Sequence, residues 1–263
     1  MATSSNGPAT VVEALFWPAL LGYGEAAVAY ASARTSRAAT WGVRLGWIAQ
    51  TALLVAQAAR ADGFPWTSWA GSLNLFVWLV VGAYLIWGCR PRFRLLGLGV
   101  MPLAAGLFIV ARLGGGIGSG EKPAYGSVFL VLHVGLVLAA FAGFTLAAAL
   151  AALYLWEESR LKRRAADILR LRLPPLASLE RLTRRTIAVS LPLLTLGLGA
   201  GIVRQRERGG SIDALEAVTL VTWLVYGGFL GFRPNGRRAA YFALCGFALV
   251  IVARLALAGS HFA

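Results

Sequence analysis

The chain contains two histidines, and each raises the question of what an imidazole does at its position. His133 interrupts an otherwise apolar stretch, YGSVFLVLHVGLVLAAFAGF, which begins at Tyr125 and ends at Phe144. His261 lies close to the C-terminal end. A neutral imidazole can ligate a metal through one ring nitrogen and donate a hydrogen bond through the other. The two residues therefore predict either a ligand pair or two separate structural contacts, depending on where the surrounding elements place them.

Those elements are predicted to be membrane helices. Of 263 residues, 58% are hydrophobic and only 14% are charged, and the mean hydropathy is +0.69. A soluble protein carries about 25% charged residues. The apolar runs are about 20 residues long and do not alternate with period two, so they predict helices rather than barrel strands. We expect one all-α membrane domain over 1–263, a bundle of about eight transmembrane helices. The expected spans are approximately 11–31, 41–60, 69–88, 95–113, 125–156, 185–204, 212–232 and 239–258.

The distribution of basic residues predicts the orientation. The loops after spans 1, 3, 5 and 7, with Arg44 beside the first, hold 18 of the 25 Lys and Arg residues. The positive-inside rule places these loops in the cytoplasm and both chain ends outside, in a cytoplasmic (inner) membrane. The net charge of +14 then reports orientation and attraction to anionic lipid, and no nucleic-acid partner is expected. We expect no cleaved signal peptide, because the N-terminal residues lack a basic region.

A basic loop over 157–184 is the one sizeable cytoplasmic segment. Its first part is predicted to be an amphipathic helix that ends at Pro174 and Pro175 and lies on the inner membrane surface. A docking site for a cytoplasmic partner is the alternative. The outer loops are too short for a catalytic domain. Because no nucleophile–base pair or phosphate-binding loop is recognisable, no enzymatic activity is predicted.

This topology puts both histidines on the outer side. His133 lies roughly 12 Å into its helix from the outer end, and His261 follows the last span. Two imidazoles approaching from opposite faces are what the axial site of a planar metal macrocycle requires. The alternative, which spacing alone favours, is one histidine that packs between helices and one in a frayed tail.

Charged residues near the outer face bear on the same choice. Arg112 and Arg254 lie where cations are disfavoured, as partners for the propionates of such a macrocycle or as snorkelling side chains. Asp213 and Glu216 begin the seventh span with D-x-x-E spacing, which is typical of a capping box and also places carboxylates at the outer mouth. A third set, listed next, lies within the spans and either lines a transport path or packs helices together: Glu25, Gln50, Gln57 and Asn74.

Four segments together resemble the CcsA/CcmC/ResC family of cytochrome c assembly proteins and its smaller HemX-like relatives. They are RLGWIAQTALLVAQAARADGFPWTSWAGSLNLFVWLV, LHVGLVLAAFAGFTLAAALAALYLWEESRLK, IDALEAVTLVTWLVYGGFLGFR and GFALVIVARLALAGSHF. The similarity covers about residues 41 to 261. It implies that His133 and His261 are external axial ligands of haem. We expect haem b held without a covalent bond, and from their positions at the outer side we include Arg112, Arg254, Asp213 and Glu216 in the predicted cofactor-binding site.

The chain also departs from the family pattern. It has no tryptophan between Trp156 and Trp223, where assembly members carry a tryptophan-rich loop. Gln50 and Gly231 stand where relatives have in-membrane histidines. The resemblance therefore implies a small HemX-like member with an external haem site, and it does not imply the attachment of haem to cytochrome c.

Three functions follow in descending order. The first is haem handling in cytochrome c maturation, with haem, membrane lipid and a cytochrome c assembly protein as partners. The second is a HemX-like regulator of glutamyl-tRNA reductase in tetrapyrrole synthesis. The third, a small-molecule transporter, is weaker because no inverted repeat or broken helix pair is visible.

Overall fold

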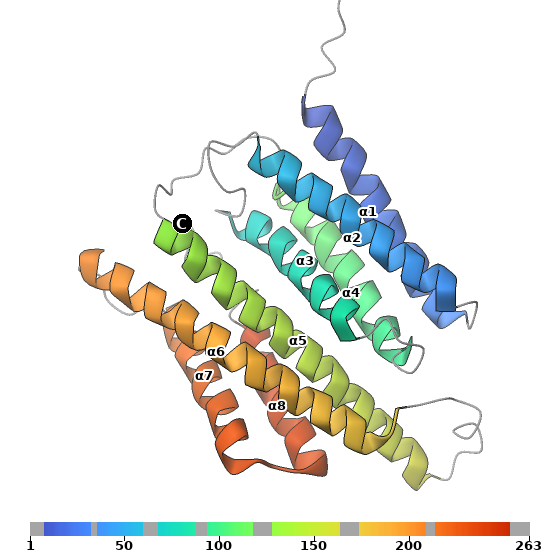
Figure 1. Ribbon diagram of the computed structural model, residues 1–263, viewed down its shortest axis with the longest axis vertical. Coiled ribbons are helices and arrows are strands. Elements are labelled where there is room, and N and C mark those ends of the chain that lie inside the picture. The colour runs from blue at the N-terminus through green and yellow to red at the C-terminus, as the bar shows by residue number, and fades with distance from the viewer. Residues whose placement is uncertain are drawn as a thin grey trace, which may run out of the picture. The chain divides into compact units, whose positions relative to one another are not determined.

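A computed structural model describes residues 8–32, 36–59, 68–87, 94–117, 128–163, 174–208 and 214–252. These residues form eight α-helices and no strand (Figure 1). The helices are α1 (Pro8–Ala31), α2 (Ser36–Ala58), α3 (Trp69–Trp87), α4 (Arg94–Leu113), α5 (Val128–Lys162), α6 (Leu176–Arg208), α7 (Ala214–Phe232) and α8 (Gly236–Ile251).

The predicted fold class, an all-helical membrane bundle, is confirmed. Over the described residues, five helices are long and apolar enough to cross a membrane: α3, α4, α5, α6 and α7. Helix α1 carries Glu13 and Glu25, α2 carries Arg44 and two glutamines, and α8 is described over only 16 residues. In hydrocarbon every backbone N–H and C=O needs an internal partner, and a helix supplies one within the segment. The orientation with both ends outside stays a prediction.

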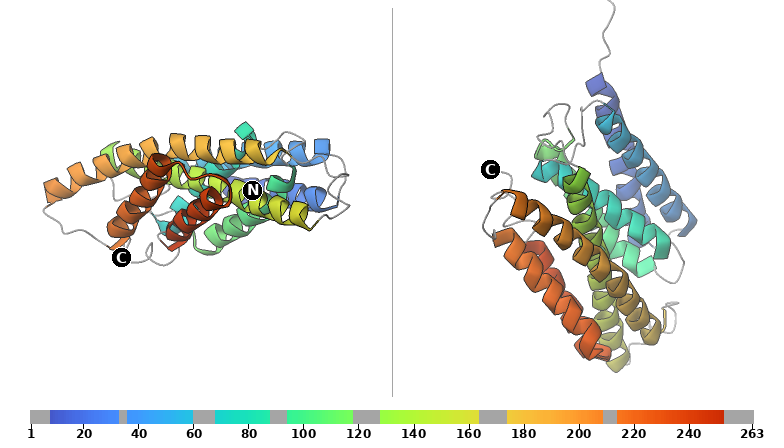
Figure 2. Two further views of the ribbon diagram at one scale, coloured as in Figure 1. Left: turned by 90° about the horizontal axis from the view of Figure 1, so that it is seen from below. Right: turned by 60° about the vertical axis from the view of Figure 1, so that its left-hand side comes forward.

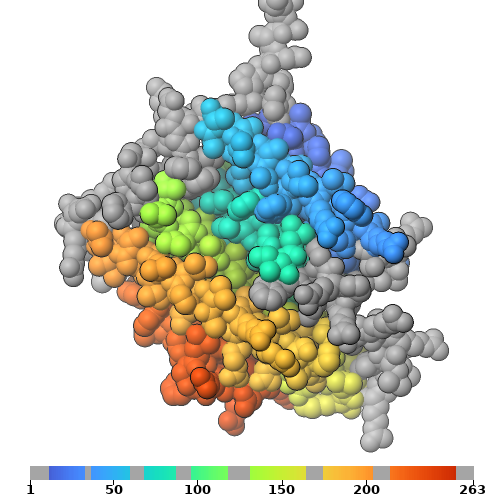
Figure 3. Space-filling model, viewed as in Figure 1, coloured from blue at the N-terminus to red at the C-terminus, as the bar shows by residue number. Residues whose placement is uncertain are grey.

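Two outer helix faces carry the apolar side chains expected of a protein that contacts lipid. On α2, Leu45, Ile48 and Val55 are exposed, and on α6, Val189 and Leu196 are exposed. Parts of α2 and α6 lie open on the face drawn in Figure 3. In water such rows of exposed apolar side chains would mark an interaction surface, whereas lipid tails cover them without a penalty.

The described helices fall into two compact groups, and each is considered by itself. The first group contains α1, α2, α3 and, from Gly97 onward, α4. Helices α1 and α2 approach closely through glycines: a Cβ at Gly22 would lie 2.7 Å from the Gly42 carbonyl oxygen. A Cβ at Gly46 would lie 2.9 Å from the Tyr23 ring. Small residues at crossings are the usual means by which membrane helices pack.

The second group contains α5 to α8, and its long pair α5 and α6 lie side by side in Figures 1 and 2. Helix α5 has 35 residues and α6 has 33. At 1.5 Å per residue each is roughly 50 Å long, whereas the hydrocarbon core is about 30 Å thick. Part of each helix must therefore extend beyond the hydrocarbon. Charged residues lie at the end of α5 and at the start of α6. They indicate that the two helices extend beyond the hydrocarbon at this end, which they share.

The connection between α5 and α6 is shorter than the expected loop over 157–184. Helix α5 continues to Lys162, and α6 already begins at Leu176. Pro174 and Pro175 precede α6, and the Pro175 carbonyl accepts the N–H groups of Ser178 and Leu179. Proline suits a helix start because its missing N–H would have no intrahelical acceptor there. These prolines therefore open α6. The predicted amphipathic helix falls mainly on 164–173, outside the described residues.

Aromatic packing joins the remaining helices of the second group. Phe144 of α5 and Tyr226 of α7 stack with ring centroids 3.8 Å apart. The Tyr226 hydroxyl donates a hydrogen bond of 3.1 Å to the Ala243 carbonyl of α8. Gly246 makes room for this ring, because a Cβ there would lie 2.5 Å from it. This contact fixes α7 and α8 against α5, the helix that carries His133.

Candidate functional site

His133 lies in the second turn of α5 and is half-buried. Its Nδ1 atom is 2.6 Å from the carbonyl oxygen of Gly197 in α6. The imidazole therefore has a polar partner, although α5 is otherwise apolar around it. This is the interhelical packing contact that the simpler sequence interpretation predicts, and it also orients the ring.

The identity of the acceptor decides the protonation of the ring. A carbonyl oxygen has no hydrogen to give, so the nitrogen that faces it must carry one. A hydrogen bond through this contact assigns the N–H to Nδ1 of His133, and in the neutral imidazole the lone pair is then on Nε2. Histidines that ligate metals commonly use this arrangement, with one ring N–H held by a backbone carbonyl or carboxylate. The structural contact and the ligand role are thus compatible.

The other predicted site residues of the second group are only partly described. His261, Arg254 and Asp213 lie outside the described residues, so the pairing of the two histidines stays a prediction. Glu216 lies in the first turn of α7, the position of the acidic member of a capping box. A carboxylate is favourable there because the helix N-terminus is electropositive.

Arg112 belongs to the first group, where it has a local partner. Its Nη2 atom lies 3.0 Å from Oε1 of Glu13, and its guanidinium lies over the Phe16 ring at 5.9 Å from the centroid. Both charged side chains are substantially exposed, at 39% for Arg112 and 61% for Glu13. The sequence interpretation missed Glu13, because only helix packing brings α1 against α4. The propionate role of Arg112 stays a prediction.

The polar residues within the spans of the first group form one buried chain of hydrogen bonds. The Tyr23 hydroxyl donates to Gln50 Oε1 at 2.5 Å, and Gln50 Nε2 donates to Asn74 Oδ1 at 2.9 Å. Asn74 Nδ2 donates to Gln57 Oε1, and Gln57 Nε2 donates to the Gly116 carbonyl, each at 3.1 Å. These bonds link three helices and a turn, which supports the interpretation as packing contacts.

Glu25 takes no part in this chain, although the sequence interpretation grouped it with these residues. Its side chain is exposed on α1, whereas Gln50 and Asn74 have no exposed surface. The four residues therefore do not form one continuous polar path. This separation weakens the transporter interpretation, which required them to act together.

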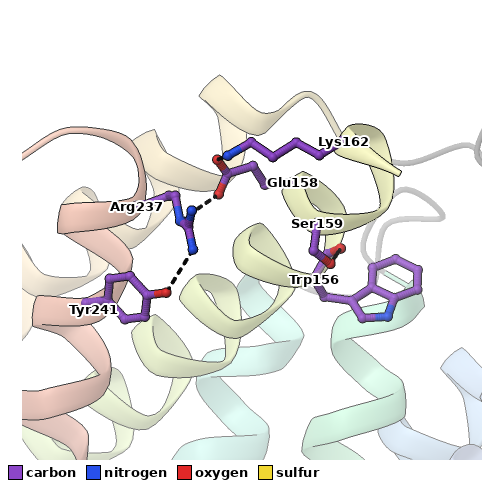
Figure 4. A network of polar contacts seen from close by, with 6 residues as sticks. All are labelled: Trp156, Glu158, Ser159, Lys162, Arg237 and Tyr241. Carbon is purple, nitrogen blue, oxygen red and sulfur yellow. Dashed lines mark hydrogen bonds and ion pairs between the residues drawn. The ribbon is translucent and has the colours of Figure 1, made fainter. Parts of the chain in front are cut away.

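A second polar cluster lies at the shared end of α5 and α6, beside the start of α8 (Figure 4). Glu158 lies 2.7 Å from Lys162 Nζ and 3.5 Å from Arg237 Nε, and Arg237 donates a hydrogen bond to the Tyr241 hydroxyl. On the same stretch of α5, the Arg160 guanidinium lies over the Trp156 ring. These contacts join α5 to α8 outside the apolar core and involve none of the predicted ligand residues.

Comparisons with known proteins can be set beside this geometry. A sequence model of the family described as cytochrome c assembly protein matches residues 66–259. The cytochrome c biogenesis protein CcsA of Guillardia theta is 28% identical over 239 residues, 80% of this chain and 79% of that protein. CcsA of Gloeothece citriformis is 28% identical over 271 residues, 82% and 83% of the two chains. Protein HemX of Brevibacillus brevis is 29% identical over 183 residues, 68% and 66% of the two chains.

Proposed function

Because this chain belongs to the cytochrome c assembly protein family, we propose that it holds haem b without a covalent bond at the outer face of the cytoplasmic membrane. His133 and His261 would be the two axial ligands. The holding of haem would serve cytochrome c maturation. Bound haem would supply a low-spin iron centre, and the chain would supply the ligands and their orientation.

The hydrogen bond from His133 Nδ1 to the Gly197 carbonyl carries this proposal. It holds the ring in the tautomer whose Nε2 lone pair is suited to a metal, before any metal is bound. A histidine that served packing alone could donate through either nitrogen. The donor chemistry at His133 therefore fits an axial ligand of haem.

The missing tryptophans limit the proposed activity to the holding of haem. No tryptophan lies between Trp156 and Trp223. The resemblance implies that larger relatives present haem on a tryptophan-rich loop in this region, and this chain lacks those tryptophans. Gln50, at a position where the resemblance implies a haem histidine, is occupied by hydrogen bonds to Tyr23 and Asn74. We therefore propose one haem site rather than two, with a partner protein required for delivery.

The absorption spectrum of the purified protein with added haemin tests this proposal. The wild-type protein should show the low-spin bands of bis-imidazole coordination, and His133→Ala and His261→Ala should each abolish them. Thr145→Ala is the matched control on α5, because its hydroxyl bonds only the Phe141 carbonyl of its own helix in the structure. The proposal is wrong if both histidine variants retain the wild-type spectrum.

The similarity to a HemX protein favours a second candidate, the regulation of glutamyl-tRNA reductase that the HemX-like resemblance implies. Its contact surface would be the basic segment over 157–184, which begins in the last turns of α5. Replacement of Lys162, Arg163 and Arg164 by Gln should then abolish binding of purified reductase. The matched control replaces Arg204, Arg206 and Arg208, the same number of charges at the opposite end of α6. Equal binding by both triple variants would exclude this candidate.

A further inference from the structure

The carbonyl that holds His133 belongs to a helix, and helical carbonyls are normally occupied. In an α-helix the carbonyl of residue i accepts the N–H of residue i+4, whose side chain flanks it. Gly201 is residue i+4 for Gly197. A second donor can reach the Gly197 oxygen from the side only if residue 201 leaves that side open.

The structure shows that Gly201 leaves this side open for His133. A Cβ at residue 201 would lie 2.7 Å from Cε1 and 2.9 Å from Nδ1 of the imidazole. Real Cβ atoms do not approach ring atoms this closely, so any side chain at 201 would push the ring off the carbonyl. Gly197 itself lets the backbones approach, because its Cβ would lie 2.8 Å from Val137 Cγ2 and 3.2 Å from the Val137 nitrogen.

We infer that the Gly197 carbonyl and Gly201 form a positioning pair on α6 that selects the Nδ1–H tautomer of His133 and aims Nε2 at a haem iron. The inference rests on the proposed function for the identity of the metal group. Its first part, the tautomer, is a property of the haem-free protein. Neither glycine is proposed to touch the haem, and each acts through the orientation of the imidazole.

Nitrogen NMR of the haem-free protein with ¹⁵N-labelled histidine tests the tautomer directly. The chain has only two histidines, so His261→Gln leaves a single imidazole and assigns the spectrum. His133 should carry its proton on Nδ1 in the wild-type protein. A proton on Nε2 would overturn the inference. This measurement needs no variant at Gly201, so it remains decisive even if such a variant fails to fold.

Gly201→Ala tests the positioning role, and Gly199→Ala is its control on the same helix. A Cβ at Gly199 meets no atom within 4 Å, and both variants gain the same helix propensity. Gly201→Ala should shift the His133 nitrogen resonances and weaken haem binding by roughly 10- to 100-fold, as is typical when a partner of a metal ligand is lost. Gly199→Ala should leave both unchanged.

The outcomes separate this inference from the proposed function. If Gly201→Ala lowers stability but retains the wild-type resonances and haem affinity, Gly201 has only a packing role and the inference is wrong. If His133→Ala retains the low-spin spectrum, the proposed ligand is wrong, whereas the tautomer measurement is unaffected. Two results together support both the inference and the proposed function. The wild-type protein carries the His133 proton on Nδ1, and haem affinity falls in Gly201→Ala but not in Gly199→Ala.

Discussion

Gly143 of α5 packs directly against Ser190 of α6, so closely that a Cβ on residue 143 would overlap the Ser190 hydroxyl. Both residues are buried, and the hydroxyl bonds the Thr186 carbonyl within its own helix. This contact brings the two longest helices of the second group together. It lies on the same pair of helices as the contact between His133 and Gly197.

Gly143→Ala should therefore destabilise the protein. The added methyl cannot be accommodated without moving the helices apart, which typically costs about 1–3 kcal/mol in the free energy of unfolding. Gly135→Ala is the control on α5, because its Cβ meets no atom within 4 Å. Thermal unfolding in detergent measures both. Ser190→Ala should reduce the cost of Gly143→Ala in a double variant, and an unchanged cost would contradict the proposed contact.

Asn74→Ala should destabilise the first group. It removes one of the two acceptors of Gln50 Nε2, which keeps the backbone carbonyl of residue 74, and it leaves the buried Gln57 Oε1 without its donor. Such losses cost about 1–3 kcal/mol in soluble proteins, and interhelical bonds in membranes average about 0.6 kcal/mol each. Thr145→Val is the comparison, because that hydroxyl bonds only within α5. Equal melting temperatures for the two variants would show that the buried chain contributes nothing.

Glu158→Gln should lower the melting temperature at low salt. It weakens two ion pairs, to Lys162 and to Arg237, at the end where α5 meets α8 (Figure 4). The side chain of Glu158 is 17% exposed, so solvent and salt reach the pairs. At roughly 1 M salt the charges are screened within about 3 Å, and the difference from the wild-type protein should shrink. A difference that is independent of salt would indicate lost packing.

Arg112→Gln and Glu13→Gln distinguish the two roles considered for Arg112. As an exposed ion pair, each substitution should cost no more than about 1 kcal/mol, and the effects should not add in the double variant. Haem titration provides the second readout. If Arg112 contacts a propionate, Arg112→Gln should weaken haem binding and Glu13→Gln should not. Unchanged affinity in both variants would remove Arg112 from the predicted site.

Several features were predictable because they depend on local sequence. The Gln50, Gln57 and Asn74 side chains had to find partners in hydrocarbon, and they find one another. The family resemblance was visible in LHVGLVLAAFAGF and GFALVIVARLALAGSHF, and the matching family model covers both stretches. The sequence alone thus identified which polar side chains lie within each span, without any knowledge of how the helices pack.

Other features were not predictable. Glu13 was missed because it pairs with Arg112 across 99 positions. The division of 157–184 was not predicted: residues 157–162 continue α5 and residues 176–184 begin α6. Glu158 and Glu180 make i,i+4 ion pairs there, which suit helix ends that project from the membrane. A charge count does not distinguish a solvated helix end from a loop.

The amino-acid sequence alone was sufficient for the helices and the membrane setting, because a backbone in lipid must satisfy its hydrogen bonds within each segment. The state of His133 required the tertiary structure. Gly197 lies 64 positions away, and its carbonyl is accessible only because Gly201 carries no side chain. A tautomer is set by the group that faces each ring nitrogen, and only the packing of α5 against α6 decides which group that is.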